Sequence, residues 1–246
     1  MLDNHVLRIS FNRVEKMNAI TRAMYGQLVD ELNKADQDFA IRAVILTSEG
    51  DHFTAGNDIY DFLEHPPTSQ DSTVSKFLAS LHNFSKPLIA AVKGNAVGVG
   101  STMLLHCDLA YAGDNAAFSM PFVNLGLCPE AASSLLAVHL MGYQRAAEAL
   151  LMGEPFMVET ALELGLISRV LPPSEVHAYA QSQAQKMARK PLSSLLETKR
   201  LMKAARTPAV LAQMDEEAQV FSRMLKEPAA IEAFSAFMEK RKPVFS

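Results

Sequence analysis

The sequence predicts an α/β fold in which helices cover a largely parallel β-sheet. In the first half of the chain, short β-rich runs alternate with amphipathic helices, an alternation that is typical of a parallel sheet. After residue 127 helices dominate, and one predicted strand, over 167–171, interrupts them. We expect the helical part after about Pro191 to pack on the core or on another subunit, because it has little strand to cover within its own span.

The elements of the first third follow from local patterns. Residues 6–11 alternate as a half-buried strand does, and a helix follows Thr21, whose side chain is a candidate N-cap. The apolar run 42–48 predicts a buried strand that ends in a turn. Residues 65–72 form a polar, proline-containing loop, which we expect to be the most mobile segment.

The rest of the chain continues the alternation and then becomes helical. The pattern predicts a helix over 74–84 and an apolar strand over 88–92. A glycine-rich turn over 94–100 leads into a helix at 101–106. Two further short strands are expected at 107–113 and 116–120. Further helices are expected at 130–141, 144–152, 159–164, 175–189, 192–205, 208–226 and 228–240.

The composition is that of a globular protein, with 49% hydrophobic and 20% charged residues. We expect a core domain over 1–190 that contains the functional site, and a helical region over 191–246 for packing and oligomerisation. The net charge of -4 gives no broad electrostatic reason to bind nucleic acid or membranes. Cys107 and Cys128 lie far apart, which indicates a reducing compartment. Because no membrane-length apolar run or secretory signal is evident, we expect a soluble cytoplasmic protein.

Two glycine-containing turns follow buried strands. HFTAGNDI (52–59) comes after the strand at 42–48, and GNAVGVGS (94–101) comes after the strand at 88–92. Sites form at the C-terminal ends of parallel strands, and glycine lets backbone N–H groups point outward. Two such turns side by side predict an oxyanion hole, in which two N–H groups stabilise negative charge on one carbonyl oxygen.

The second turn fits no other common motif. It is neither a dinucleotide fingerprint nor a P-loop, and the chain has no G-x-S-x-G nucleophile elbow. Ser101, His106 and Asp108 are too close in sequence for a convincing triad, and Ser101 is better explained as a helix N-cap. The histidines have no metal-binding spacing, so no metal site is expected. A purely structural turn stays open for each glycine segment.

A single carboxylate interrupts the apolar stretch around LCPEAASS, at 127–134. Two interpretations of Glu130 stay open from these residues. Pro129 and Glu130 suit a helix start, where an acid complements the helix dipole. The other interpretation is a general base in an apolar pocket.

Taken together, FTAGNDI (53–59), KPLIAAVKGNAVGVG (86–100) and CDLAYA (107–112) resemble the crotonase (enoyl-CoA hydratase/isomerase) superfamily. The resemblance extends from the N-terminal strand to FMEKRKP near the C-terminus. It implies a crotonase-like (ClpP/crotonase) spiral of ββα units with a C-terminal helical trimerisation region, and an acyl-CoA thioester substrate. It also implies a homotrimer or a dimer of trimers, and oxyanion donors at the backbone N–H groups of Asn57 and Val99.

The chain departs from the hydratase pattern of this family. Hydratases use two glutamates to activate water, and the matching positions here are Thr102 and Phe122, which cannot act as bases. The segment around Glu130 is similar to the Δ3,Δ2-enoyl-CoA isomerase branch, in which one glutamate at this position is the base. The resemblance therefore implies an isomerase that converts 3-enoyl-CoA to 2-enoyl-CoA, with Glu130 as its base.

The resemblance also implies a groove for CoA, which is part of the substrate, so no separate cofactor is expected. The residues implied there are Lys16, Met17, Ala19, Ala55, Gly56, Asp58, Ile59, Gly98, Phe122, Leu127, Phe237 and Lys240. The basic run 240–242 either meets the CoA phosphates or forms a solvated helix end. Candidates for the acyl pocket, which plain core packing would also explain, are Phe62, Leu63, Phe77 and Phe122.

Alternative functions stay open. On the same fold, Glu130 alone would support weak hydration or another acyl-CoA enolate chemistry. From a different class, the chain would be a non-catalytic acyl-CoA-binding homologue. A ClpP-like serine peptidase lacks a persuasive set of serine, histidine and aspartate.

Overall fold

A six-stranded β-sheet forms the main layer of the computed structural model, which describes residues 1–67 and 71–245. Its order is β1-β2-β3-β4-β6-β9, and neighbours are parallel except for the antiparallel pair β1 and β2. Within the same residues, a smaller sheet has the order β5-β7-β8. The strands are β1 (Leu2–Asp3), β2 (Val6–Phe11), β3 (Ala43–Ser48), β4 (Leu88–Val92), β5 (Asn95–Val97), β6 (Leu109–Gly113), β7 (Ala117–Ser119), β8 (Phe156–Met157) and β9 (Arg169–Leu171).

Helices connect the strands and make up the C-terminal part of the chain. They are α1 (Arg22–Gln37), α2 (Ile59–Glu64), α3 (Thr73–Asn83), α4 (Val99–Thr102), α5 (Ser133–Met141), α6 (Tyr143–Ala147), α7 (Val158–Glu163), α8 (Val176–Ala188), α9 (Leu192–Ala204), α10 (Thr207–Met224) and α11 (Pro228–Met238). Short 3-10 helices span Val14–Lys16, Met103–His106 and Val123–Leu125, and a π-helical turn spans Glu148–Met152.

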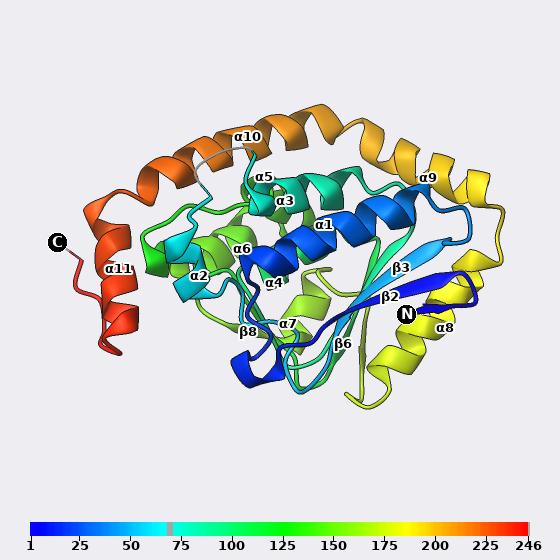
Figure 1. The fold of residues 1–246 in the computed structure, drawn as a ribbon, viewed down its shortest axis with the longest axis horizontal. Coiled ribbons are helices and arrows are strands. Elements are labelled where there is room, and N and C mark those ends of the chain that lie inside the picture. Colours follow the sequence, from blue (N-terminus) through cyan, green and yellow to red (C-terminus); the bar gives the residue numbers. More distant parts are fainter. Residues whose placement is uncertain (68–70, 246) are drawn as a thin grey trace.

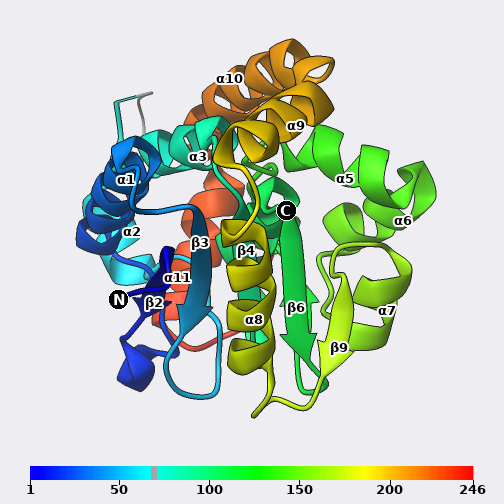
Figure 2. The ribbon, with the colours of Figure 1, turned by 90° about the vertical axis from the view of Figure 1, so that its right-hand side faces the viewer.

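Helices cover both faces of the inner strands. Along β3, Val44 and Leu46 belong to the larger apolar cluster, whereas Ala43 and Ile45 face the cluster that α8 contributes to. This alternation follows the normal pleat of a strand. Because helices cover both faces of β3, all of its residues are buried. Figure 2 shows α8 in front of the sheet, running along β4.

Helix α1 begins where the sequence predicts. The Thr21 side chain accepts a hydrogen bond from the Met24 N–H at 3.3 Å, which makes it the N-cap. At the other end, the buried Lys86 ammonium group donates to the carbonyl oxygens of Ala35 and Asp38, at 2.6 and 2.7 Å. A cation at this position satisfies carbonyl groups that the helix itself leaves unpaired.

The helix predicted to start at 130 begins three residues later, at Ser133. Ala131 and Ala132 have φ values of 61° and 54°, a left-handed conformation that interrupts a right-handed helix. Glu130 therefore lies in a loop before α5, and the prediction that it starts this helix is wrong. The pattern could not reveal this, because alanine rarely adopts that conformation.

The second glycine-rich segment is more ordered than predicted. Strand β5 lies within the turn expected over 94–100, and the helix expected at 101–106 is α4 followed by a 3-10 turn. Ser101 lies inside α4, so its predicted role as an N-cap is wrong. Its hydroxyl instead donates to the Ala96 carbonyl at 2.6 Å and accepts from the Ser119 N–H, which ties the helix to the smaller sheet.

Helix α2 was not predicted. The Asp58 carboxylate accepts hydrogen bonds from two backbone N–H groups in the first turn of α2, so Asp58 is the N-cap of this helix. An aspartate before an amphipathic run is the sequence signal that indicates such a helix start. The loop expected to be most mobile, 65–72, contains residues 68–70, which lie outside the described residues.

The C-terminal helices α9, α10 and α11 follow one another around the edge of the molecule, as Figure 1 shows. The rings of Phe221 and Phe234 lie 6.2 and 6.0 Å from the ring of Phe62. The buried Lys199 ammonium group lies 2.7 Å from the Asp108 carboxylate. These contacts join the region after residue 190 to the core, while the division into two domains stays a prediction.

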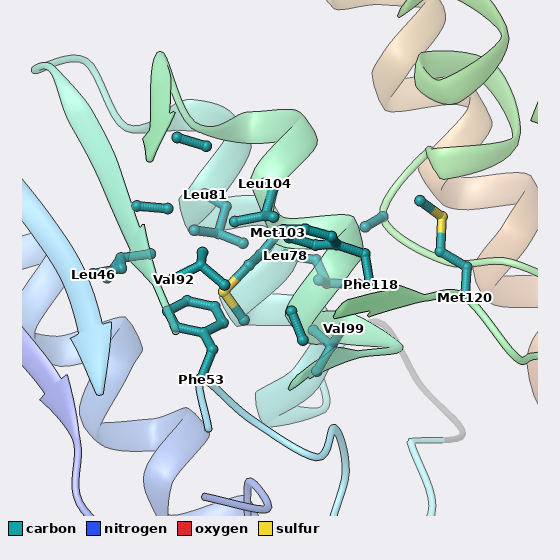
Figure 3. Packing of buried hydrophobic residues seen from close by; sticks show 14 of the residues in the cluster. Leu46, Phe53, Leu78, Leu81, Val92, Val99, Met103, Leu104, Phe118 and Met120 are labelled. Carbon is teal, nitrogen blue, oxygen red and sulfur yellow. The ribbon is translucent and has the colours of Figure 1, made fainter. Parts of the chain in front are cut away.

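Phe53 anchors the loop after β3 in the core. It is fully buried, and its ring meets the ring of Phe11 edge-on at 5.4 Å. Figure 3 shows Phe53, Val92 and Met103 pointing toward one another, near Val99. The loop that carries the first glycine segment is thus fixed by apolar packing.

Replacing Phe53 with alanine is expected to lower the free energy of unfolding by about 3–5 kcal/mol, because a buried ring is lost and a cavity remains. Urea denaturation followed by circular dichroism measures this change. Phe39→Ala is the matched control, since Phe39 is 87% exposed and should change the free energy by about 0.5 kcal/mol or less. Equal losses in the two variants would contradict this account of the loop.

Candidate active site

Thr54 joins the two glycine segments. Its backbone N–H donates to the Asn95 carbonyl and its own carbonyl accepts from the Val97 N–H, both at 3.0 Å. Its hydroxyl donates to the Asn18 carbonyl at 2.7 Å and accepts from the Gly56 N–H at 3.0 Å. These bonds hold the loop after β3 alongside β5, in the way that two neighbouring strands pair in a sheet.

The close approach of the two segments requires glycine at two positions. Gly56 has a φ of 87°, and a Cβ atom there would lie 2.9 Å from the Val97 carbonyl oxygen. A Cβ atom on Gly100 would lie 2.5 Å from the methyl carbon of Thr54. Any side chain at either position would push the segments apart.

Two residues whose backbone N–H groups have no acceptor among the described residues lie at the same cavity. Within the described residues, neither the Asn57 N–H nor the Val99 N–H donates a hydrogen bond to another group of the chain. Val99 is the first residue of α4, where the N–H has no partner inside the helix. Asn57 and Val99 line the same cavity. Two unpaired donors facing one cavity are what an oxyanion hole requires.

This cavity, of about 480 Å³, is lined by every predicted binding residue except Lys240. Its mainly apolar wall also includes Phe62, Phe221 and Phe234. Of the other acyl-pocket candidates, Phe77 packs in the core, with its ring 5.3 Å from that of Tyr25, and Leu63 is 42% exposed.

The basic run after α11 does not line this cavity. Lys240 is exposed and does not line it, so its predicted contact with CoA stays a prediction. The Arg241 guanidinium forms ion pairs with Glu232 and Glu239, both at 2.5 Å. Arg241 therefore supports the alternative of a paired, solvated helix end.

No carboxylate of the main cavity is suited to act as a base, among the residues that the structure describes. The cavity contains Glu15 and Asp58. The Glu15 side chain is 73% exposed. Although burial favours the protonated form of Asp58, hydrogen bonds from Arg13 and from the first turn of α2 hold its pKa below the usual range. Thr102 and Phe122, which the family resemblance matches to the hydratase glutamates, are buried and carry no acid.

Tyr25 is a part of the site that the sequence analysis missed. Its hydroxyl donates to the Asn57 side-chain oxygen at 2.5 Å, and the residue is 1% exposed. Burial raises the pKa of Tyr25 well above its usual value, and the nearby Glu130 raises it further. A signal was present, because a buried tyrosine normally needs a partner for its hydroxyl.

Glu130 is buried without a partner for one of its oxygens. The residue is 7% exposed, and its Oε1 atom finds no hydrogen bond among the described residues. Burial raises the pKa of Glu130 to about 8, and the negative charge of Glu217 contributes to this rise. Glu130 lines a second cavity, of about 360 Å³, and Phe221 lies in the walls of both cavities. A buried carboxyl group with a raised pKa is typical of a catalytic acid or base.

Comparisons with known proteins show the family of the chain. A family model described as enoyl-CoA hydratase/isomerase matches residues 2–246. The chain is 34% identical to 2,3-dehydroadipyl-CoA hydratase of Escherichia coli K12, over 98% of this chain and 94% of that protein. It is 32% identical to enoyl-CoA delta isomerase 2 of Rattus norvegicus, over 96% of this chain but only 62% of that longer protein.

Solved structures are also similar over almost the whole length. An enoyl-CoA hydratase/isomerase from Pseudoalteromonas atlantica T6c has a TM-score of 0.95 and 40% identity, and the match covers 100% of this chain and 98% of that one. Pseudomonas aeruginosa OdaA has a TM-score of 0.94 and 44% identity, over 97% of each chain. These matches confirm the crotonase-like fold and the helical C-terminal region that the sequence predicts.

The described part of the chain has neither a membrane-spanning helix nor a cluster of metal-binding side chains. No helix within 1–67 or 71–245 is both long and apolar enough to span a membrane. The same ranges contain no cluster of three His, Cys, Asp or Glu side chains that could hold a metal ion. The expectations about membranes, metals and nucleic acid stay predictions.

Replacing Gly56 with alanine is expected to lower the free energy of unfolding by about 1–3 kcal/mol, because alanine would be strained at this φ and too close to Val97. Gly26→Ala is the matched control. Gly26 lies in α1 with open space around it, so alanine should raise the free energy by about 0.5–1 kcal/mol. Denaturant titration measures both. Effects of the same sign would contradict the close approach described here.

Proposed function

The chain belongs to the enoyl-CoA hydratase/isomerase family, whose activity is on acyl-CoA, and we propose that it is an isomerase converting 3-enoyl-CoA thioesters to 2-enoyl-CoA. In this reaction a base removes a proton from C2, which gives a dienolate, and the proton is returned at C4. The observation that carries the proposal is the buried carboxyl group of Glu130, whose Oε1 atom has no hydrogen-bond partner among the described residues. By the family resemblance, Thr102 and Phe122 replace the two hydratase acids in this site.

The proposed oxyanion hole consists of the Asn57 and Val99 N–H groups. The thioester oxygen accepts a hydrogen bond from each, and negative charge develops on this oxygen as the C2 proton leaves. Each donor supplies on the order of 3 kcal/mol to the transition state. Support comes from the cavity that both residues line and from the absence, in 1–67 and 71–245, of any acceptor for either N–H group. The hydrogen bond from Tyr25 to the Asn57 side chain holds one donor in place.

Glu130 is proposed as the single base. Its pKa of about 8 suits both halves of the reaction, because such a group accepts a proton at neutral pH and also gives it back. The acyl chain must extend from the main cavity past Phe221 to reach it, and both cavities include Phe221 in their walls. The effect of Glu130 on the pKa of Tyr25 supports its closeness to the oxyanion hole.

Hydration is the second candidate function, because one relative is named a hydratase. Adding water to a double bond calls for one group that activates water and one that supplies a proton. The main cavity offers no suitable carboxylate among its described lining residues, which favours isomerisation. An assay for water addition to a 2-enoyl-CoA separates the two functions.

The remaining parts of the proposal concern the substrate and the assembly. We propose that the chain uses no cofactor besides the CoA of its substrate, because the proton transfer and the oxyanion hole suffice. A homotrimer, or a dimer of trimers, is proposed as the assembly. It is supported by exposed apolar side chains along α6, α7 and the π-helical turn between them, which are Tyr143, Leu151, Met152 and Leu162.

Glu130→Gln is expected to reduce 3-enoyl-CoA isomerisation by about 10²–10⁴-fold, because glutamine keeps the size of the side chain but cannot accept the proton. Conversion to the conjugated 2-enoyl thioester is followed by its ultraviolet absorbance. Glu175→Gln removes an exposed carboxylate before α8 and should keep full activity. Undiminished turnover by Glu130→Gln would refute the assignment of the base.

The isomerisation rate is expected to depend on the charge of Glu130. Because the base must be ionised, kcat/KM should fall about tenfold per pH unit below pH 8 and level off above it.

The same raised pKa has a consequence for stability. Between ~pH 4.3, where an ordinary glutamate titrates, and about pH 8, the folded protein binds a proton that the unfolded chain releases. The free energy of unfolding should therefore lose this contribution as the pH rises through that window.

Rate profiles and unfolding measurements from pH 5 to 9 test this expectation. Glu130→Gln lacks the titrating group, so the part of the stability slope that belongs to Glu130 should vanish in this variant. A flat rate profile in the wild-type protein would argue against a base with a raised pKa.

A further inference from the structure

Glu217 is a second buried carboxylate, and it lies in the wall of the cavity that contains Glu130. It comes from α10, in the C-terminal region, and is 5% exposed. One carboxylate oxygen accepts from the Ala132 N–H at 2.6 Å. The other accepts from the Ser134 N–H at 3.0 Å and from the Ser134 hydroxyl at 2.5 Å. Three donors, one from Ala132 in the loop and two from Ser134 in the first turn of α5, thus converge on one side chain.

These bonds hold the backbone just after Glu130, and the position of the Glu130 side chain depends on this backbone. Ala131 and Ala132 adopt the left-handed conformation that takes Glu130 out of helix α5. Such a conformation persists in alanine only when surrounding contacts compensate for its strain. Glu217 supplies these contacts on one side of the loop, and on the other side the His106 ring nitrogen lies 2.8 Å from the Ala131 carbonyl.

We propose that Glu217 is a positioning residue for Glu130, which fixes the loop that carries Glu130 and places a negative charge beside it that favours its protonated form. The proposal rests on the proposed function in so far as it takes Glu130 to be the base. Glu217 does not itself exchange protons with the substrate, because its oxygens are occupied by donors from the loop.

The charge of Glu217 matters because burial keeps three other titratable groups around Glu130 neutral near pH 8. Burial raises the pKa of Tyr25, on α1, well above its ordinary value and that of Cys128, in the same loop, to about 11. Burial lowers the pKa of His106, in the 3-10 turn after α4, to about 4. Asp215, an exposed residue of the same helix as Glu217, also lines the cavity.

Glu217 itself has opposing influences. Burial raises its pKa, and the hydrogen bonds from Ser134 and Ala132 oppose that rise because they stabilise the ionised carboxylate. Two like charges in one buried space disfavour ionisation of both, so the proton is kept longest by the group with fewer donors. That group is Glu130, whose Oε1 atom has no partner among the described residues.

A titration of Glu130 in the intact protein tests the proposal without relying on turnover. Protein labelled with ¹³C at the glutamate side-chain carboxyl group gives one signal that is absent in Glu130→Gln, which assigns it. In the wild-type protein this signal should have its midpoint near pH 8. In Glu217→Gln the midpoint should fall by roughly one pH unit, and the rate profile for isomerisation should move in the same direction.

Two control variants separate charge from loop support. Ser134→Ala removes one donor to Glu217 but keeps the negative charge, so it should lower kcat without lowering the Glu130 midpoint. Glu175→Gln, which removes an exposed carboxylate before α8, should change neither. A midpoint that is unchanged in Glu217→Gln, or that falls equally in Ser134→Ala, would overturn the proposal.

The wild-type titration remains decisive if Glu217→Gln does not fold. A Glu130 midpoint near ~4.3, the value of an exposed glutamate, would then overturn the proposal. Failure of the proposed function has a different signature, because in that case Glu130→Gln keeps isomerase activity whatever the titration shows.

Discussion

Burial of a carboxyl group without a full set of partners is the constraint on which this site depends. An isolated ionised carboxylate in an apolar interior is so unfavourable that the group keeps its proton instead, and its pKa rises. The surroundings of Glu130 maintain this condition, since apolar residues line its cavity and its neighbour Glu217 is also acidic. The hydrogen bonds around the loop maintain this burial, because they keep the carboxyl group of Glu130 from moving into the solvent.

The proposed machinery draws on both halves of the chain. The backbone donors come from segments that follow β3 and β4, where the sheet fixes their direction. The proposed base comes from a loop that the C-terminal helix α10 supports through Glu217. The sheet thus supplies rigid donors, while the helical region adjusts the environment of the titrating group. This division agrees with a family in which related folds carry out different reactions on acyl-CoA.

Local patterns in the sequence predicted what depends on local chemistry. The buried runs of β3 and β4, the cap at Thr21 and the two glycine segments were found, and the binding residues that the family resemblance implies lie around one cavity, except for Lys240. The loop at Glu130 was misread as a helix start, because the contacts that hold Ala131 in a left-handed conformation come from distant residues. Tyr25 and Glu217 were missed for the same reason, since their partners lie far away in the sequence.

The separation of Glu217 from its partners has a consequence for the order of synthesis. The bond from Ser134 to Glu217 spans 83 positions, and Glu217 lies near the end of the chain. On the ribosome the sheet and both donor segments emerge first, and the loop at Glu130 waits for α10 to leave the exit tunnel. A nascent or prematurely terminated chain therefore holds both donor segments before the loop of Glu130 is ordered, and the part of the main cavity wall formed by Phe221, Phe234 and Phe237 is added at the same late stage.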